Sequence, residues 1–302
     1  MNILRQGHSS PLAELTTLRV GGCPVAEIRL DTAEDYEGLS TLLEQEGFPV
    51  RVLGGGSNLL VREGSLPFAV LRPMNGAGQT PEAIGPDPLA SGEERMLIRA
   101  GAGLRMPALL SWCAAHGLSG LEGLIGVPGR LGGATAMNAG AYGCSFAPLL
   151  RELTVFTPEQ GLHRVAENGW NCAYRHFSLS EPCAWFLVTD ALLSLPVKSP
   201  EEVRSRMKEN LYRKKSTQPV TARTAGCVFK NPDGESAGKL LEQAGMKGRT
   251  KGGMKFSEKH ANFLVNEGRG SYAAARELIA EAEERVARTS GITLEMEIMV
   301  WS

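Results

Sequence analysis

Several features are scarce in this sequence of 302 residues, and each scarcity excludes a class of protein. No stretch has the roughly 18 uninterrupted apolar residues of a transmembrane helix, and the first residues lack the apolar core of a signal peptide. The formal net charge is only −1, which gives no global attraction to nucleic acid or to an anionic membrane. These absences favour a cytoplasmic protein.

Cysteine and histidine are also few and scattered. The six cysteines have no C-x-x-C spacing, and the five histidines form no H-E-x-x-H pattern. We therefore expect neither a disulfide framework nor a bound metal, and nothing indicates an obligate protein partner. With 42% hydrophobic and 22% charged residues the chain is expected to fold, and its length predicts two or three domains.

Glycine, by contrast, is concentrated in residues 120–143. This stretch holds eight glycines in 24 residues, with one acidic and one basic residue and no helical periodicity. Glycine lets the backbone turn with a positive φ or approach another group closely, and main-chain N–H groups in such turns bind anions. The stretch indicates either a site for a large anionic ligand or a set of tight turns between short strands.

A second glycine cluster strengthens the ligand interpretation. Residues 48–53 alternate apolar and polar side chains as a strand does, and Gly54, Gly55 and Gly56 follow directly. Such a turn can bind a pyrophosphate through its N–H groups. It is not the dinucleotide fingerprint G-x-G-x-x-G, because Leu59 stands where the third glycine would be.

The first two thirds of the chain alternate helix and strand patterns. Apolar side chains at helical spacing predict helices over 32–46 and 106–116, and a glycine follows each. The stretch 75–92 is rich in glycine and proline and is expected to form an exposed loop. Alternating patterns predict strands at about 149–157 and 185–194.

A new unit is expected after a boundary near residues 195–199. Ser199 is a candidate helix N-cap, with Pro200 at the first helical position and Glu202 completing a capping box. The pattern beyond that helix predicts an α+β unit. Its expected order is strand 227–230, helix 236–244, strand 262–266, helix 272–290 and strand 292–301.

Both glycine clusters and the last third of the chain resemble the UDP-N-acetylenolpyruvoylglucosamine reductases. The similarity runs in one order, at compatible spacing, from about residue 16 to residue 301. The motifs that carry it are TLRVGG (17–22), LGGGSN (53–58), GLE (120–122), VPGRLGGA (127–134), MNAGAYG (137–143), YR (174–175), AGCVFKNP (225–232), AGMKG (244–248), SEKHANF (257–263) and LEMEI (294–298).

The resemblance implies an α+β fold in two parts. The first part is an FAD-binding domain of the vanillyl-alcohol-oxidase (PCMH) type, expected at 16–196 with subdomains at about 1–65 and 66–196. The second is a C-terminal α+β substrate-binding domain, expected at 197–302.

The resemblance also implies an FAD enzyme with NADPH as reductant. The family converts UDP-N-acetylglucosamine enolpyruvate to UDP-N-acetylmuramate in peptidoglycan precursor synthesis, by hydride transfer from FAD N5 to C3 and protonation at C2. Negative charge then develops on C2 and the adjacent carboxylate, so the site needs a fixed cation and a proton donor.

Three residues match the family's catalytic positions. Arg175 would bind the carboxylate and stabilise the developing charge. Cys227 stands where most members carry a serine, and a thiol can serve as the general acid at C2. Glu297 shares the non-core face of a predicted strand with Glu295, and the motif match falls on Glu297. Taken without the resemblance, the residues favour a surface ion pair for Arg175 and a buried strand cysteine for Cys227, and Glu297 is consistent with a solvated acid.

The resemblance assigns the glycine clusters to FAD and two further residues to the nucleotide sugar. Lys215 and Asn231 match family positions near the sugar nucleotide, although both are also consistent with ordinary exposed polar residues. The residues expected to bind FAD are Gly54, Gly55, Gly56, Ser57, Asn58, Leu59, Val127, Gly129, Gly132, Gly133 and Ala134.

The sequence departs from the family pattern at a few places. Phe177 replaces the serine of Tyr-Arg-x-Ser, Thr16 stands where asparagine is frequent, and Arg130 and Leu131 lie within the Pro-Gly turn. The segment 142–150 is short, which places the chain in the shorter subclass that lacks a tyrosine-loop insertion.

Two other functions stay open from the residues alone. A different PCMH-type FAD oxidoreductase, such as an oxidase of small hydroxylated molecules, would share the glycine loops but would not need the C-terminal motifs. A non-catalytic flavin-binding or nucleotide-sugar-binding paralogue is disfavoured by Arg175 and Glu297, whereas Cys227 and Phe177 are compatible with it.

Overall fold

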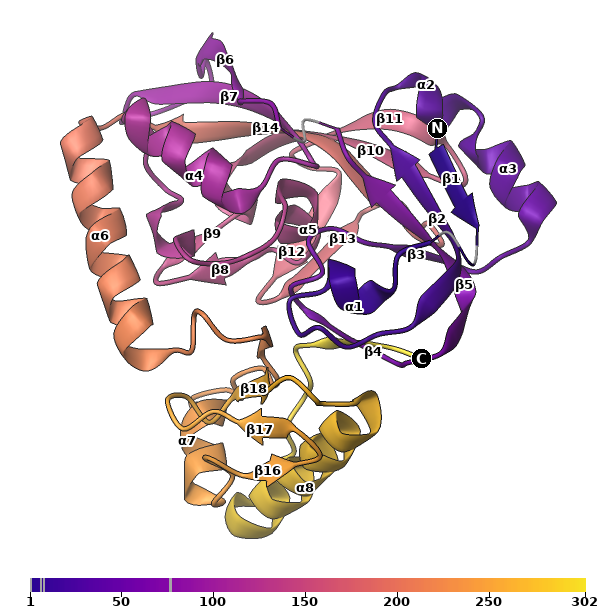
Figure 1. Cartoon of the computed structure of the whole chain (residues 1–302). Coiled ribbons are helices and arrows are strands. Elements are labelled where there is room, and N and C mark those ends of the chain that lie inside the picture. Colours follow the sequence, from indigo (N-terminus) through magenta and orange to yellow (C-terminus); the bar gives the residue numbers. More distant parts are fainter. Residues whose placement is uncertain (1, 6, 8, 76–77) are drawn as a thin grey trace. The chain divides into compact units, whose positions relative to one another are not determined.

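The computed structural model describes residues 2–5, 7, 9–75 and 78–302, and the chain divides into two compact units. Both units mix helices with β-sheet (Figure 1), which confirms the α+β class. The units are discontinuous in sequence, whereas the predicted domains 16–196 and 197–302 follow the chain, so those boundaries stay a prediction. Unit 1 comprises Met1–Leu4, Ala26–Gly55 and Phe68–Tyr212, and unit 2 comprises Arg5–Val25, Gly56–Pro67 and Arg213–Ser302.

Unit 1 is built on a five-stranded antiparallel sheet in the order β11–β10–β14–β7–β6. Leu153, Val155 and Leu193 are fully buried, while their strand neighbours Thr154 and Leu192 are partly exposed, as alternating side chains require. The buried side chains form one core with those of helices α4 and α5. The bounds are β6 Glu82–Pro86, β7 Arg95–Gly101, α4 Met106–Ala115, α5 Leu131–Ala136, β10 Leu150–Thr157, β11 Gly161–Ala166 and β14 Leu187–Pro196.

These bounds confirm the predicted helix at 106–116 and the predicted strands at 149–157 and 185–194. The prediction of an exposed loop at 75–92 is wrong in part, because Glu82–Pro86 forms an edge strand that pairs only with β7. An edge strand needs hydrogen bonds on one side alone and so tolerates Pro86, which made this segment read as a loop.

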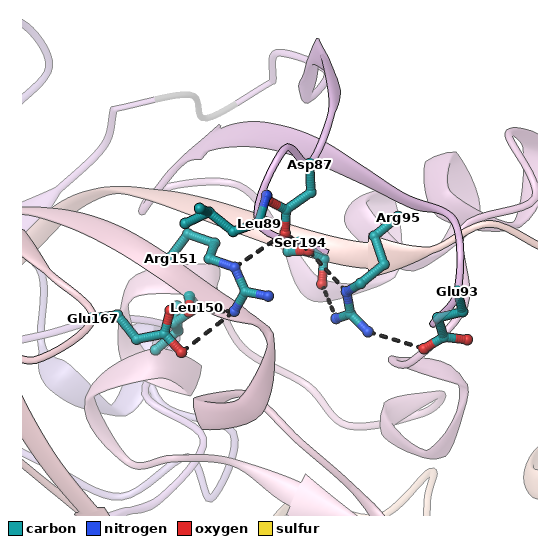
Figure 2. Close-up of polar contacts among 8 residues, drawn as sticks. All are labelled: Asp87, Leu89, Glu93, Arg95, Leu150, Arg151, Glu167 and Ser194. Carbon is teal, nitrogen blue, oxygen red and sulfur yellow. Dashed lines mark hydrogen bonds and ion pairs between the residues drawn. The ribbon is translucent and has the colours of Figure 1, made fainter. Parts of the chain in front are cut away.

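A buried carboxylate ties the segment after β6 to the sheet (Figure 2). Asp87 accepts hydrogen bonds from the Ser194 hydroxyl at 2.5 Å, from Arg151 Nε at 3.1 Å and from the Leu89 N–H at 3.0 Å. Arg95 Nε donates to the same Ser194 hydroxyl at 2.9 Å. Burial raises the pKa of Asp87, but the hydrogen bonds from Ser194, Leu89 and Arg151 outweigh it and hold that pKa below its ordinary value.

This carboxylate makes the stability of the protein sensitive to acid. Because its folded pKa is depressed, Asp87 stabilises the fold above its unfolded pKa of about 3.9 and loses that contribution as pH falls further. We expect Asp87→Asn to cost about 1–3 kcal/mol at neutral pH and to flatten the acid side of the stability profile. Urea unfolding at several pH values measures both effects. Equal acid sensitivity in wild type and variant would contradict this role.

The remaining part of unit 1 contains a second sheet and two short helices. Residues 26–30, 50–52 and 68–73 belong to a sheet of order β1–β2–β5–β3. The predicted helix over 32–46 is confirmed but broken at Gly38, and Gly47 ends it in the left-handed region with φ of 65°. The bounds are β1 Asn2–Arg5, β2 Cys23–Leu30, α2 Glu34–Glu37, α3 Leu39–Glu46, β3 Val50–Val52 and β5 Ser65–Pro73.

Unit 2 packs α7 and α8 with the antiparallel sheet β15–β18–β17–β16 around its own core. Helices near 236–244 and 272–290 and a strand near 262–266 are confirmed. Its strands and helices span β15 Thr224–Cys227, α7 Ala237–Gln243, β16 Thr250–Lys251, β17 Met254–Phe256, β18 Phe263–Asn266 and α8 Tyr272–Ser290.

Two strand predictions in unit 2 need correction. The strand predicted at 227–230 lies earlier, at Thr224–Cys227, and the strand predicted at 292–301 is confined to β19, Met299–Trp301. Before β19 an isolated bridge joins Met296 to Phe229, and β19 then pairs in parallel with β4. Trp301, which strict alternation would place on the same face as Glu295 and Glu297, is buried.

The other elements are short, apart from one long helix. That helix, α6, begins at Pro200 as predicted, and the Ser199 hydroxyl accepts a hydrogen bond from the Glu202 N–H at 3.2 Å. The bounds are α1 Leu12–Leu15, β4 Leu59–Val61, η1 Glu122–Leu124, β8 Gly140–Ala141, β9 Cys144–Ser145, η2 Ala147–Leu149, β12 Trp170–Ala173, β13 His176–Leu179 and α6 Pro200–Thr217.

Candidate functional site

The two glycine clusters meet backbone to backbone in unit 1. A Cβ atom added to Gly55 would lie 2.4 Å from Gly129 Cα, and one added to Gly54 would lie 3.2 Å from Gly133 Cα. The sequence predicted that these glycines allow another group to approach the backbone closely. Within the protein that group is the other glycine cluster, because one glycine turn is packed on the other. Together they form a surface of main-chain atoms, which we call the glycine cradle (residues 54–55 and 127–134).

Most cradle glycines are required by the packing of the protein itself. Gly129 has a φ of 126°, and a Cβ on Gly132 would approach Ala102 Cβ to 2.7 Å. The same holds outside the cradle for Gly56 of unit 2, which has a φ of 62° and whose added Cβ would lie 2.2 Å from the Leu15 carbonyl oxygen. A larger residue at any of these glycines would therefore disturb the fold itself, whether or not a ligand is bound.

Gly133 is different. It lies inside helix α5, where glycine is about 1 kcal/mol less favourable than alanine. A Cβ there would meet Gly54 Cα at an ordinary contact distance of 3.6 Å. Neither backbone conformation nor internal packing demands glycine at this position. The half-buried main chain of Gly133, beside Gly54, fits a large ligand such as FAD lying against the cradle.

The continuation of the first glycine cluster, residues 56–59, belongs to unit 2 and is joined to the terminal strand. Asn58 Nδ2 donates to the Glu297 carbonyl oxygen at 3.0 Å, and the Met299 N–H donates to the Asn58 carbonyl oxygen at 3.0 Å. Leu59 begins β4 and is paired with Met299 of β19. Residues 56–59 and the segment that carries Glu297 are therefore joined by hydrogen bonds within unit 2.

Glu297 and Cys227 are brought together in the same unit. The Glu297 N–H donates to the carbonyl oxygen of Val228, the residue after Cys227, at 2.8 Å. The Asn262 side chain holds the segment that follows β15, accepting from the Phe229 N–H at 2.9 Å and donating to the Phe229 carbonyl at 2.8 Å. Both Cys227 and Glu297 are half-buried. A thiol and a carboxylate thus lie on adjacent, fixed segments of backbone.

Glu295 takes a separate place. Its side chain is 74% exposed and forms an ion pair with Lys230, on the solvent side of the same segment. The motif match selects Glu297 rather than Glu295, and their environments also differ. Glu297 is half-buried, whereas Glu295 is exposed to solvent and paired with a lysine.

Arg175 occupies the two-residue turn of the hairpin formed by β12 and β13 in unit 1. Its φ is +54°, the left-handed conformation that two-residue hairpin turns use, which costs energy for a residue with a side chain. The guanidinium lies 5.2 Å from the ring centre of Tyr174, and a Cβ on Gly140 would approach its Nη1 to 3.5 Å. Asn138 Nδ2 donates to the Ala173 carbonyl at 3.0 Å and fixes the hairpin.

The departure at Phe177 affects the core of unit 1. Phe177 is 7% exposed and stacks on Trp170 with ring centres 6.1 Å apart. Its ring packs β13 of the Arg175 hairpin into this core, and a serine at this position would have no ring to stack on Trp170.

The two predicted substrate residues have structural contacts in unit 2. Asn231 Oδ1 accepts from the Ala237 N–H at 3.0 Å at the start of α7. Lys215 is exposed, and its carbonyl oxygen accepts a hydrogen bond from the Lys259 ammonium. The adjacent Lys214 is buried, a feature that the sequence did not signal.

The described residues contain no cluster of three or more His, Cys, Asp or Glu side chains that could hold a metal ion. None of the helices among these residues is long and apolar enough to cross a membrane.

Comparisons with known proteins match both parts of the chain. The FAD binding domain model matches residues 24–166, and the model of the UDP-N-acetylenolpyruvoylglucosamine reductase C-terminal domain matches residues 218–301.

Full-length relatives agree. The chain is 48% identical to the UDP-N-acetylenolpyruvoylglucosamine reductase of Oleidesulfovibrio alaskensis, covering 96% of each chain. It is 46% identical to that of Nitratidesulfovibrio vulgaris, covering 96% of this chain and 97% of the relative. The crystal structure of the Thermus caldophilus enzyme superposes with a TM-score of 0.79 at 36% identity, covering 97% and 98% of the two chains.

Proposed function

Because the chain belongs to the UDP-N-acetylenolpyruvoylglucosamine reductase family, we propose that it reduces UDP-N-acetylglucosamine enolpyruvate to UDP-N-acetylmuramate with NADPH. The observation that carries the proposal is the match over nearly the whole chain, C-terminal domain included. An unrelated FAD enzyme with the same glycine loops would have no need of that domain. A cytoplasmic location, no obligate protein partner and the domain boundaries 16–196 and 197–302 remain parts of this proposal.

The cofactor is FAD, and the cradle residues are proposed to hold it. When bound, FAD takes up a hydride from NADPH and supplies one to C3 of the enolpyruvyl group. Gly133 is the cradle glycine that the protein's own packing does not require, whereas Gly54, Gly129 and Gly132 keep the cradle's shape. The proposed set also includes Gly55, Gly56, Ser57, Asn58, Leu59, Val127 and Ala134.

Three side chains are proposed to manage charge and the proton at the enolpyruvyl group. Arg175 binds the carboxylate through its guanidinium fork and stabilises the negative charge that develops there. The Cys227 thiol donates a proton to C2, leaving a thiolate that regains its proton from solvent. Glu297 orients the donor from its adjacent backbone segment, joined to Val228 by a hydrogen bond. Lys215 and Asn231 are proposed to contact the nucleotide sugar.

A methyl group at position 133 tests the cradle. Gly133→Ala adds one carbon where the protein has room, so the fold should be kept or slightly stabilised. Crowding against FAD should cost about 1–3 kcal/mol, which is roughly fivefold to hundredfold weaker binding. Flavin fluorescence titration measures this affinity. The matched control is Gly38→Ala, where a Cβ meets nothing within 4 Å. Unchanged FAD affinity in Gly133→Ala would remove this residue from the cradle.

The absorbance spectrum of the purified protein tests the proposed function. The protein should be yellow, should bleach with NADPH in the absence of oxygen, and should regain its colour when the enolpyruvyl sugar is added. Recovery only with oxygen or with a small hydroxylated compound would instead select another FAD oxidoreductase. Protein that cannot be reconstituted with FAD would indicate a non-catalytic paralogue.

A further inference from the structure

Three arginines of unit 1, Arg72, Arg105 and Arg130, have no role in the assignments above, and we call them the arginine cluster. Arg105 and Arg130 face each other in an isolated antiparallel bridge, which places their side chains on the same side of the paired backbone. The Arg130 guanidinium donates to the Gly103 carbonyl oxygen. Arg72 lies at the end of β5, just before the segment whose residue Asn75 accepts a hydrogen bond from the Gly103 N–H at 2.7 Å.

The cluster is under electrostatic repulsion. Burial lowers the pKa of Arg130, and the positive charges of Arg72 and Arg105 lower it further. Like charges that face each other across paired strands destabilise the pair. An anion that binds between these cations would relieve the repulsion and stabilise the fold.

The protein supplies little of that negative charge itself. The buried carboxylate of Glu27 pairs with Arg72 at 2.5 Å, but it also pairs with Arg29 at 2.9 Å. Arg105 and Arg130 form no ion pair within the described part of the chain, and the buried Nε of Arg72 has no hydrogen-bond partner there. Donors therefore remain available at each of the three guanidinium groups.

The cluster is continuous with the glycine cradle. A Cβ on Gly55 would lie 3.1 Å from the main-chain nitrogen of Arg130, and the Gly129 carbonyl accepts from the Met106 N–H at 3.1 Å, one residue after Arg105. The bare backbone of the cradle and the cationic side chains therefore belong to one short stretch of surface within unit 1.

We propose that Arg72, Arg105 and Arg130 bind the diphosphate of FAD. Guanidinium groups form paired, charge-assisted hydrogen bonds with phosphate oxygens. The choice of FAD over the diphosphate of the nucleotide sugar rests on location, because all three arginines fall in the part that matches the FAD-binding domain and none falls in the part that matches the C-terminal domain. The inference rests on the proposed function, and it makes Arg130, a departure from the family motif, a cofactor ligand.

Flavin affinity separates this role from a structural one. Full-length protein freed of flavin is titrated with FAD and with riboflavin, which lacks phosphate. Arg105→Gln and Arg130→Gln should each weaken FAD binding about tenfold to hundredfold and leave riboflavin binding unchanged. Arg130→Lys, which keeps the charge but loses the fork, should fall between wild type and Arg130→Gln. The control is Arg164→Gln, whose side chain is 72% exposed and 3.9 Å from its partner Glu152.

Thermal unfolding of the flavin-free protein adds a second readout. Arg105→Gln removes repulsion and breaks no ion pair among the described residues, so its Tm should equal or exceed that of wild type. Low FAD affinity with an undiminished Tm supports the proposal. Equal losses of FAD and riboflavin affinity would make the cluster structural and overturn it.

Two further results keep the inference distinct from the proposed function. If wild type binds no FAD at all, the proposed function fails. If wild type binds FAD and the arginine variants bind it equally well, only the diphosphate assignment fails. Normal FAD affinity combined with a raised KM for NADPH or for the nucleotide sugar would overturn the assignment by moving the cluster to that ligand.

Discussion

Cys227→Ala should reduce the rate of flavin reoxidation by the enolpyruvyl sugar about 10²–10⁴-fold, the usual effect of losing a general acid. Flavin bleaching by NADPH should proceed near its normal rate, because that half-reaction needs no proton at C2. Stopped-flow absorbance of the two half-reactions, recorded separately without oxygen, measures both rates.

Two further variants make this test specific. Cys227→Ser should recover most of the reoxidation rate, since a hydroxyl occupies this position in most of the family. Cys183→Ala removes a thiol that lies in no proposed site and should behave as wild type. Reoxidation of Cys227→Ala at the wild-type rate would show that Cys227 is only a packing residue and that water or another group supplies the proton.

Arg175→Lys should lower the rate of the same half-reaction by about 10²–10³-fold, comparable to the loss of one donor that stabilises a developing anion. Lysine keeps the charge but cannot bind the carboxylate with two parallel hydrogen bonds. Bleaching by NADPH should again be near normal.

Arg175→Gly separates chemistry from backbone strain. Glycine adopts the φ of +54° found at this turn without cost, so the thermal stability of this variant should not fall for backbone reasons. We expect an activity at least as low as that of Arg175→Lys. A glycine variant with wild-type turnover would show that the turn, and not the guanidinium, matters.

The sequence predicted the elements whose signals are local. Helix α6 begins at the predicted capping box, and α3 ends at the predicted glycine, because caps act within one turn of helix. Edge strand β6 was missed because it ends in Gly85 and Pro86 and lies within a segment rich in glycine and proline. The terminal strand was predicted too long because alternation continues through a change of partner strand.

The candidate site was predictable to a similar degree. Motif order selects Cys227 and Glu297 as candidates, whose roles stay a prediction, and the fold places them on hydrogen-bonded neighbouring segments. Sequence could not separate Gly133, which the protein's packing does not require, from Gly132, which a Cβ contact with Ala102 does require. The arginine cluster was also invisible, because its members are joined by tertiary contacts, although Arg130 stood out as a departure from the motif.

The central claim is that this chain reduces an enolpyruvyl nucleotide sugar. Its most direct test mixes the NADPH-reduced protein with UDP-N-acetylglucosamine enolpyruvate without oxygen, follows flavin absorbance and identifies the product by mass. We predict that flavin absorbance recovers in one turnover and that the product carries two more hydrogen atoms than the substrate. Flavin that stays reduced until oxygen is admitted, with the sugar unchanged, would contradict the account.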